Sequence, residues 1–206
     1  MHHFEDLYEI NRSTKYVEAV RSHQSVLNAQ NRTRGIEARR GDGTFGGIIP
    51  HESPLTDTGY AVARGPIATT EIGVEMKILA KAMIKQIDRV TGDLRKQVAQ
   101  FRRGGKKAIS VGIVGINHAA HTVSFEGDRA TPTTGRGGFP HPIQEAEEAE
   151  RRLRANAAPE FDEFIVLRYR ATNEQPFAFD WVDYDSTRQD YGAALARISR
   201  EYQERF

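Results

Sequence analysis

The chain has 206 residues, of which 38% are hydrophobic, enough to bury the core of one compact domain. It contains no cysteine, which excludes disulfides, thiolate metal sites and cysteine nucleophiles. Its formal net charge is +1, so affinity for phosphates has to come from local clusters of charge. No run approaches the roughly 18 apolar residues that a membrane-spanning helix needs. We therefore expect a single cytoplasmic domain over residues 1–206 with no membrane partner.

Apolar periodicity and turn residues predict alternating helices and strands. The nearly continuous apolar run 109–116 is typical of a central strand buried on both faces. In chain order we expect a helix over 13–30, a strand over 45–49, a hairpin that ends at residue 79, a helix over 81–103, strands over 108–116 and 121–125, a helix over 143–156, strands over 161–170 and 177–181, and a helix from 188 to the end. This order indicates an α/β fold with a mixed central sheet flanked by helices.

The segment 71–79 (Glu-Ile-Gly-Val-Glu-Met-Lys-Ile-Leu) alternates polar and apolar residues, which is the pattern of a half-buried strand. Such a strand would present Glu71, Glu75 and Lys77 from one face, behind a packed apolar face. Charges that share one side of a rigid strand favour a site for a metal ion or a phosphate. This strand is therefore the first candidate for a catalytic site.

A hairpin would bring a second carboxylate to this strand. Gly65-Pro66 is a turn signal, and folding the chain about Pro66 as an antiparallel pair places Asp57 opposite Glu75. The two carboxylates could then share Mg²⁺, whose preferred ligands are hard oxygens. Lys77 could orient a water molecule or stabilise charge that develops on the phosphorus, and Glu71 could assist as an accessory acid. The alternative is a surface hairpin with incidental charges.

The order Pro54-Leu55-Thr56-Asp57, then Glu75-Met76-Lys77, a helix and a strand resembles the PD-(D/E)XK nuclease superfamily. The resemblance covers residues 13 to 125, approximately, and implies the αβββαβ core of a restriction endonuclease, with residues 140–206 packed on the same domain. It implies that Asp57 and Glu75 bind Mg²⁺, for which Mn²⁺ would substitute, and that Lys77 is the catalytic lysine. Pro54 stands three residues before Asp57, whereas the family places it next to the aspartate. A further carboxylate, Glu18 or Glu37, could join the site.

A basic segment follows the candidate strand. Residues 81–107 carry nine basic and two acidic side chains, a local charge of +7. We expect Lys81, Lys85 and Arg89 to contact DNA phosphates, with binding that weakens steeply as salt rises. Arg136, in a glycine-rich loop, could enter a groove and contact guanine. The alternatives are an ordinary solvated helix face and a connecting loop.

Three other patterns carry less weight. Residues 41–46 (Gly-Asp-Gly-Thr-Phe-Gly) match the dinucleotide-binding fingerprint, but that fingerprint needs a preceding strand and a following helix, and the expected elements here are reversed. His118 and His121 have a metal-like spacing but no evident third ligand. Phe177, Phe179 and Trp181 favour the core over a platform for nucleic-acid bases.

Together these observations predict a Mg²⁺-dependent endonuclease of restriction type that cleaves double-stranded DNA. Cleavage at a symmetric site would suit a homodimer, and a cognate DNA methyltransferase would be the expected partner. Two alternatives stay open. One is a repair or junction-resolving nuclease of the same superfamily, and the other is a nucleic-acid-binding protein without catalytic activity.

Overall fold

A computed structural model describes residues 2–28, 42–103, 107–126, 129–131 and 141–206. Seven strands form one mixed sheet in the order β3-β1-β2-β4-β5-β8-β9, and β6 and β7 form a separate two-stranded sheet. The elements in chain order are α1 (His2–Glu9), α2 (Thr14–Arg21), β1 (Ser25–Asn28), β2 (Gly43–Gly47), β3 (Arg64–Gly65), β4 (Ile72–Leu79), α3 (Met83–Arg103), β5 (Ile109–Asn117), β6 (Ser124–Glu126), β7 (Arg129–Thr131), α4 (Pro142–Asn156), the 3₁₀ helix η1 (Ala158–Glu160), β8 (Glu163–Arg170), β9 (Asp180–Trp181) and α5 (Tyr184–Arg205). The predicted α/β class with a mixed sheet is confirmed.

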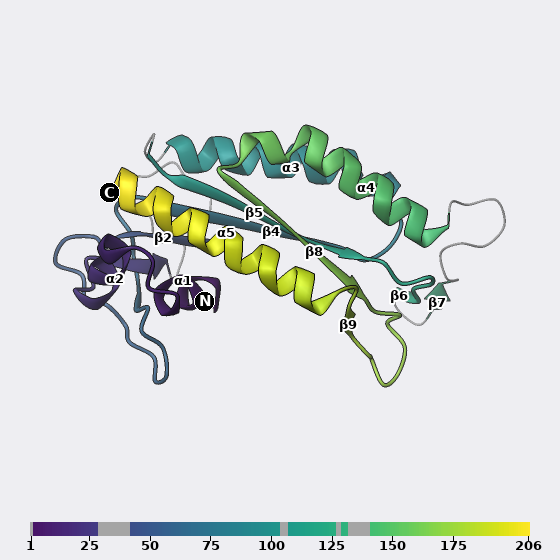
Figure 1. Cartoon of the computed structure of the whole chain (residues 1–206), viewed down its shortest axis with the longest axis horizontal. Helices are drawn as coiled ribbons and strands as arrows, with labels where there is room; N and C mark the ends of the chain where they lie inside the picture. Colours follow the sequence, from purple (N-terminus) through teal and green to yellow (C-terminus); the bar gives the residue numbers. More distant parts are fainter. Residues whose placement is uncertain (1, 29–41, 104–106, 127–128, 132–140) are drawn as a thin grey trace.

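Helices cover both faces of the sheet. α3 and α4 lie on one face, and α1, α2 and α5 lie on the other (Figure 1). Two apolar clusters follow from this arrangement: one joins α3 and α4 to Val114, Ile116 and Val166, and the other joins α1, α2 and α5 to the opposite face. β5 pairs in parallel with both β4 and β8, and every residue of β5 is buried. This burial between two helical layers explains its continuous apolar sequence.

The long basic helix is confirmed as α3. Its buried residues recur every three or four positions, so one apolar stripe faces the sheet. The last turn of α3 lies very close to β4, since a Cβ atom built on Gly73 would lie 2.4 Å from the Phe101 ring. Glycine at position 73 therefore sets how closely the second half of α3 approaches the strand that carries Glu75.

The predicted helix over residues 13–30 is wrong in its second half. α2 ends at Arg21, His23 adopts a positive φ of 56°, and Ser25–Asn28 form β1. Val26 and Leu27 continue the apolar spacing of α2, but they are buried as consecutive residues of a strand with layers on both faces. A short apolar run of this kind does not distinguish a helix from a buried strand. α5 also begins earlier than residue 188, because Asp183 caps it by accepting a hydrogen bond from the Ser186 amide.

The predicted hairpin about Pro66 is wrong as well. β4 pairs antiparallel with β2, with Gly43 opposite Val74 and Phe45 opposite Ile72. Of the segment expected to pair with β4, only Arg64 and Gly65 form a strand, and that strand, β3, pairs in parallel with β1. The predicted hairpin placed apolar residues on one face and polar residues on the other over a few positions. That pattern alone does not exclude pairing of β4 with residues 43–47, which is the pairing that forms.

Within the described part of the chain, every helix is too short or too polar to cross a membrane.

Candidate functional site

Asp42 and Glu75 meet where β2 begins. Asp42 directly precedes β2, and the pairing of Gly43 with Val74 brings it alongside β4. One carboxylate oxygen of Asp42 accepts a hydrogen bond of 2.7 Å from the Met76 amide. This bond holds the Asp42 side chain at the edge of β4, next to the Gly43–Val74 pair at which the pairing of β2 with β4 ends.

Glu75 is the buried acid of the site. It is 7% exposed, and its carboxylate forms an ion pair with the ammonium group of Lys77, two residues along the same face of β4. Burial raises the pKa of Glu75, the hydrogen bond from Lys77 opposes that rise, and the charge of Asp42 adds to it. The net direction is upward, so the ionised form of Glu75 is less favourable here than it is in water.

The second half of α3 completes the pocket. Asp42, Glu75 and Lys77 line a cavity of about 430 Å³ whose other residues come from α3 and include Asp93, Lys96, Gln97, Gln100 and Arg103. The side-chain oxygen Oε1 of Gln100 is buried, and no group within the described residues donates a hydrogen bond to it. The described lining of the cavity therefore combines three carboxylates, two side-chain amides and three cationic side chains.

Asp57 does not join this site, which corrects the hairpin prediction. Its carboxylate pairs with the Arg64 guanidinium through bonds of 2.5 and 2.6 Å. Arg64 belongs to β3, and β1 and β2 lie between β3 and β4 in the sheet. Three strand spacings amount to about 14 Å, too far for carboxylates to share one ion.

The accessory acids are also separate from Glu75. Glu71 precedes β4, accepts a hydrogen bond of 2.7 Å from Ser25 and another from the Tyr202 hydroxyl, and so faces α5. Glu18 is exposed on α2, which packs on the same face as α5. Both lie away from the α3 side on which Glu75 and Lys77 face the pocket. Glu37 lies outside the described residues.

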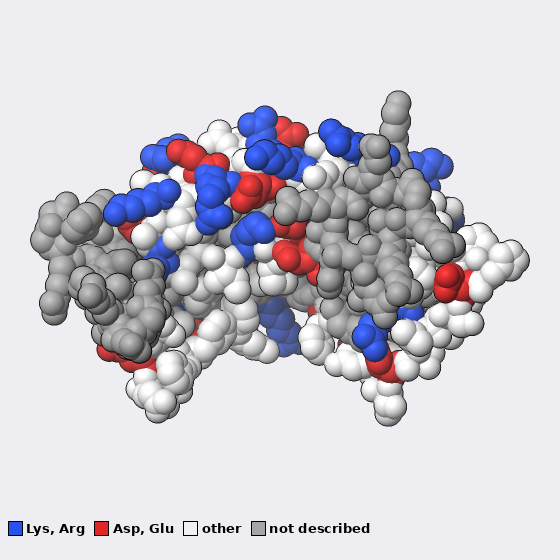
Figure 2. All heavy atoms as spheres, turned by 180° about the vertical axis from the view of Figure 1, so that it is seen from behind, with Lys and Arg blue, Asp and Glu red and all other residues white. Residues whose placement is uncertain are grey.

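The basic residues near the site differ from those expected. Lys96 and Arg103 line the pocket, whereas Lys85 and Arg89 lie on the first half of α3 and Lys81 lines a different cavity beyond the end of β4. Arg136 lies outside the described residues. The basic run is also partly neutralised, because Arg89 lies 3.9 Å from Asp93 and Arg95 lies 3.3 Å from Glu160. Figure 2, which views the molecule from behind, shows Lys and Arg side chains gathered where α3 and α4 run, with acidic side chains between them.

Asp42 is the site residue that sequence reasoning missed. It stands within the Gly41–Gly46 pattern, which was weighed only as a nucleotide-binding motif. The expected strand forms as β2, two residues earlier than predicted and so within the pattern, and Gly46 serves packing: a Cβ on Gly46 would lie 1.9 Å from the carbonyl oxygen of Thr69. An acid immediately before a glycine-rich strand was the available signal, but nothing local shows that this strand pairs with β4.

The donor set suits a small, hard divalent cation. Magnesium is commonly bound by one or two carboxylates together with water and substrate phosphates. Asp42 and Glu75 supply two such carboxylates, and Gln100 lines the same cavity. No group of three or more His, Cys, Asp or Glu side chains placed to hold a metal ion occurs within the described residues. A Mg²⁺ ion that keeps much of its water shell fits these donors, and a closed all-protein cage does not.

His118 and His121, whose spacing resembles that of metal ligands, lie beyond the carboxyl end of β5. His121 pairs with Glu174 at 2.9 Å, and burial lowers the pKa of His118. The expectation that Phe177 and Phe179 belong to the core is wrong, since their side chains are 58% and 53% exposed.

Comparison with protein-family models, with curated proteins and with solved structures finds no match for this chain.

Proposed function

We propose that the chain is a metal-dependent endonuclease that hydrolyses phosphodiester bonds of DNA, with Asp42, Glu75 and Lys77 at its catalytic site. The observation that carries the proposal is the meeting of Asp42, directly before β2, with Glu75 and Lys77 of the adjacent β4 in one polar pocket. The order α2, β1, β2, β4, α3, β5, interrupted only by the two-residue strand β3 before β4, supports it, because the resemblance to the PD-(D/E)XK superfamily implies an αβββαβ order. The aspartate ligand is then Asp42 and not Asp57.

Each residue of the pocket has a defined task in this proposal. Asp42 and Glu75 would hold Mg²⁺, which polarises the scissile phosphoryl group and acidifies water. An ammonium group has three donors, so Lys77 can keep its bond to Glu75 and still orient the attacking water and stabilise charge on the phosphate. Lys96 and Arg103, which line the same cavity, would pair with neighbouring phosphates of the substrate strand.

The balance of charge within the cavity supports a site that is completed by its ligands. Asp42, Glu75 and Asp93 oppose Lys77, Lys96 and Arg103, so the cavity has no large net charge of its own. A divalent cation neutralises the acids and leaves the bases free to bind a phosphate. Substrate and metal therefore favour each other's binding, which is the behaviour expected when an ion is shared between protein carboxylates and a phosphate.

Cleavage of supercoiled plasmid DNA tests the proposal. We expect cleavage with Mg²⁺ or Mn²⁺ and none with a chelator. Lys77→Ala should lower the rate by about 100- to 10,000-fold, the usual contribution of a group that positions a proton transfer. Asp42→Asn should abolish cleavage, whereas Asp57→Asn, the matched control, should leave it intact. Absence of cleavage with any divalent ion would favour a nucleic-acid-binding protein without catalytic activity.

The restriction role is the finer part of the proposal. A restriction enzyme would cut duplex DNA at a defined sequence, would act as a homodimer on a symmetric site and would be paired with a DNA methyltransferase that protects that sequence. A repair or junction-resolving enzyme would prefer branched or partly unpaired DNA. Mapping the cleavage positions on matched duplex and branched substrates distinguishes the two roles.

A further inference from the structure

An exposed group of aromatic side chains lies beyond the carboxyl ends of the parallel strands. Tyr169 and Phe179 are stacked, with ring centroids 5.4 Å apart and planes 18° apart. Trp181 meets the edge of Phe179 at 5.0 Å. More than half of the surface of Phe177 and of Phe179 stays exposed to solvent. Large aromatic side chains held together at a surface are typical of a binding site.

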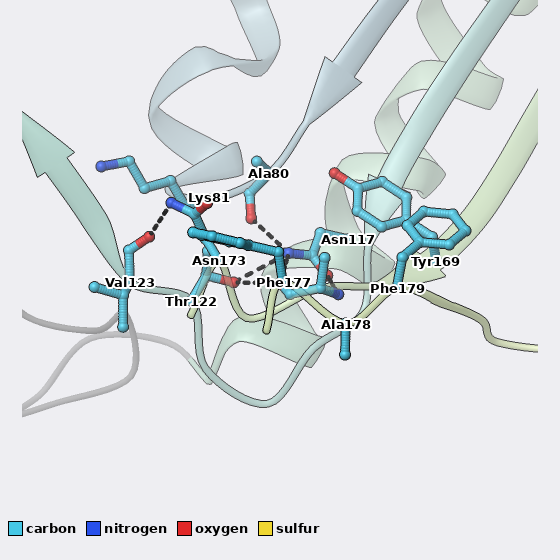
Figure 3. A pocket seen from close by; sticks show the side chains of 11 residues that line it. Ala80, Lys81, Asn117, Thr122, Val123, Tyr169, Asn173, Phe177, Ala178 and Phe179 are labelled. Atoms are coloured by element: carbon cyan, nitrogen blue, oxygen red, sulfur yellow. Dashed lines mark hydrogen bonds between the residues drawn. The ribbon is translucent and has the colours of Figure 1, made fainter. Parts of the chain in front are cut away.

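These aromatic residues border a cavity of about 400 Å³. It opens where β4, β5 and β8 end, which is the usual place for a ligand in a sheet with parallel strands. Figure 3 shows the Tyr169–Phe179 pair at one end of the cavity, Lys81 at the other and Phe177 between them. The cavity therefore offers flat apolar surfaces at one end and a cation at the other.

The rim of the cavity is held by hydrogen bonds. The side-chain amide of Asn117 donates to the carbonyl oxygens of Ala80 and Ala171 at 3.2 and 2.7 Å, which ties the end of β4 to the segment after β8. Asn173 donates to the carbonyl oxygen of Val123 at 3.0 Å. Glu174, three residues before Phe177, is paired with His121. The cavity is therefore already formed in the protein, and none of the described residues that line it is acidic.

We propose that this cavity binds an unpaired nucleobase of the substrate, stacked on Phe179 and Phe177, with Lys81 directed at an adjoining phosphate. Every nucleobase presents a flat aromatic face, so stacking needs no particular base sequence. A phosphate next to the base complements the charge of Lys81. This inference rests on the proposed function, because it assigns the cavity to the same nucleic-acid strand.

The path from the metal site to the cavity follows β4. β2 pairs with β4 only as far as Val74. Beyond Val74, no described strand pairs with the edge of β4 that faces β2. Ala80, on the rim of the cavity, stands five residues after Glu75, which is about 16 Å along an extended strand. This distance corresponds to about five nucleotides at the duplex rise of about 3.4 Å per nucleotide, and to fewer in an extended single strand.

Trp181 provides the assay, because it is the only tryptophan of the chain and it contacts Phe179. Its fluorescence is followed in the presence of a chelator while the full-length protein is titrated with a single strand of DNA of about 12 nucleotides, which spans both sites. We expect quenching by this strand and none by a strand of equal length whose sugars carry no bases. Phe179→Leu should weaken binding about 5- to 150-fold, the range expected for the loss of one stacked base.

Two variants serve as controls. Phe179→Tyr keeps the ring and should bind as the unmodified protein does, and Tyr60→Leu removes another exposed aromatic side chain at a distant position and should change nothing. Equal affinity of Phe179→Leu and the unmodified protein, equal quenching by the strand without bases, or no quenching by any strand would overturn the inference. Quenching that depends on Phe179, without any metal-dependent cleavage, would support binding of a base in the cavity and contradict the proposed function. Metal-dependent cleavage without that quenching would support the proposed function and contradict binding of a base in the cavity.

Discussion

Replacing Glu75 by glutamine should stabilise the protein without metal and abolish its response to metal. The Glu75 carboxylate is 7% exposed and lies beside Asp42, so its charge is unfavourable in spite of Lys77. A substitution that removes an unfavourable charge of this kind usually raises the free energy of unfolding by about 0.5–2 kcal/mol. For a domain of this size we expect the melting temperature to rise by about 1–8 °C in a chelator.

Divalent metal should reverse the order of the two proteins. At a concentration 100 times its dissociation constant, a ligand that binds only the folded state adds about 2.7 kcal/mol. The melting temperature of the unmodified protein should then rise by about 5–11 °C. This increase exceeds the one that Glu75→Gln produces in a chelator, because about 2.7 kcal/mol is more than about 0.5–2 kcal/mol. The assay is thermal unfolding, followed by circular dichroism, of both proteins with a chelator and with saturating Mn²⁺.

The pH dependence of the same difference gives a second check. The pKa of Glu75 is raised above 4.5 in the folded state, so the folded protein binds more protons than the unfolded chain as pH rises from about that value. The contribution of Glu75 to stability therefore falls as pH rises through this window. We expect the advantage of Glu75→Gln to be small below pH 4.5 and to grow above it.

Glu148→Gln is the matched control. Hydrogen bonds from Arg151 and Arg152 lower the pKa of Glu148 to about 2, so removal of its charge should not stabilise the protein. A lower melting temperature for Glu75→Gln than for the unmodified protein in chelator, or an undiminished response of that variant to Mn²⁺, would refute the reasoning.

Two further predictions concern α3. Gly73→Ala places a methyl group against the Phe101 ring and should lower the free energy of unfolding by about 1–3 kcal/mol, whereas Gly92→Ala, in open space within α3, should raise it by about 0.5–1 kcal/mol; urea unfolding of both variants measures the two effects, and a Gly73→Ala variant as stable as the unmodified protein would contradict this packing. Replacing both Lys96 and Arg103 by alanine should reduce the slope of log K against log [salt] for DNA binding by about 1.8, while Arg151→Ala on α4 should leave the slope unchanged; fluorescence anisotropy across a salt series measures the slope, and an unchanged slope for the double variant would exclude α3 from the proposed DNA-binding surface.

Much of the fold could be predicted because its signals are local. The apolar run of β5 and the three-or-four-residue spacing in α3 each define an element without reference to the rest of the chain. The proximity of Glu75 and Lys77 could also be predicted, because alternate residues of a strand share a face.

The partner of Glu75 could not be predicted in the same way. Asp42 reaches it through the pairing of β2 with β4, which joins residues about 30 positions apart and leaves no local trace. The hairpin about Pro66 satisfied the same alternation, so sequence pattern alone did not distinguish Asp57 from Asp42. Phe177 and Phe179 were misjudged for a related reason: a β-like composition favoured a buried strand, but the segment forms the exposed edge of a cavity.

The most direct test of the proposed metal site is X-ray diffraction at the manganese absorption edge from crystals grown with Mn²⁺. We expect an anomalous difference peak between the carboxylates of Asp42 and Glu75, and no such peak in crystals of Asp42→Asn. A peak beside Asp57, or a peak that persists in Asp42→Asn, would contradict the proposed site.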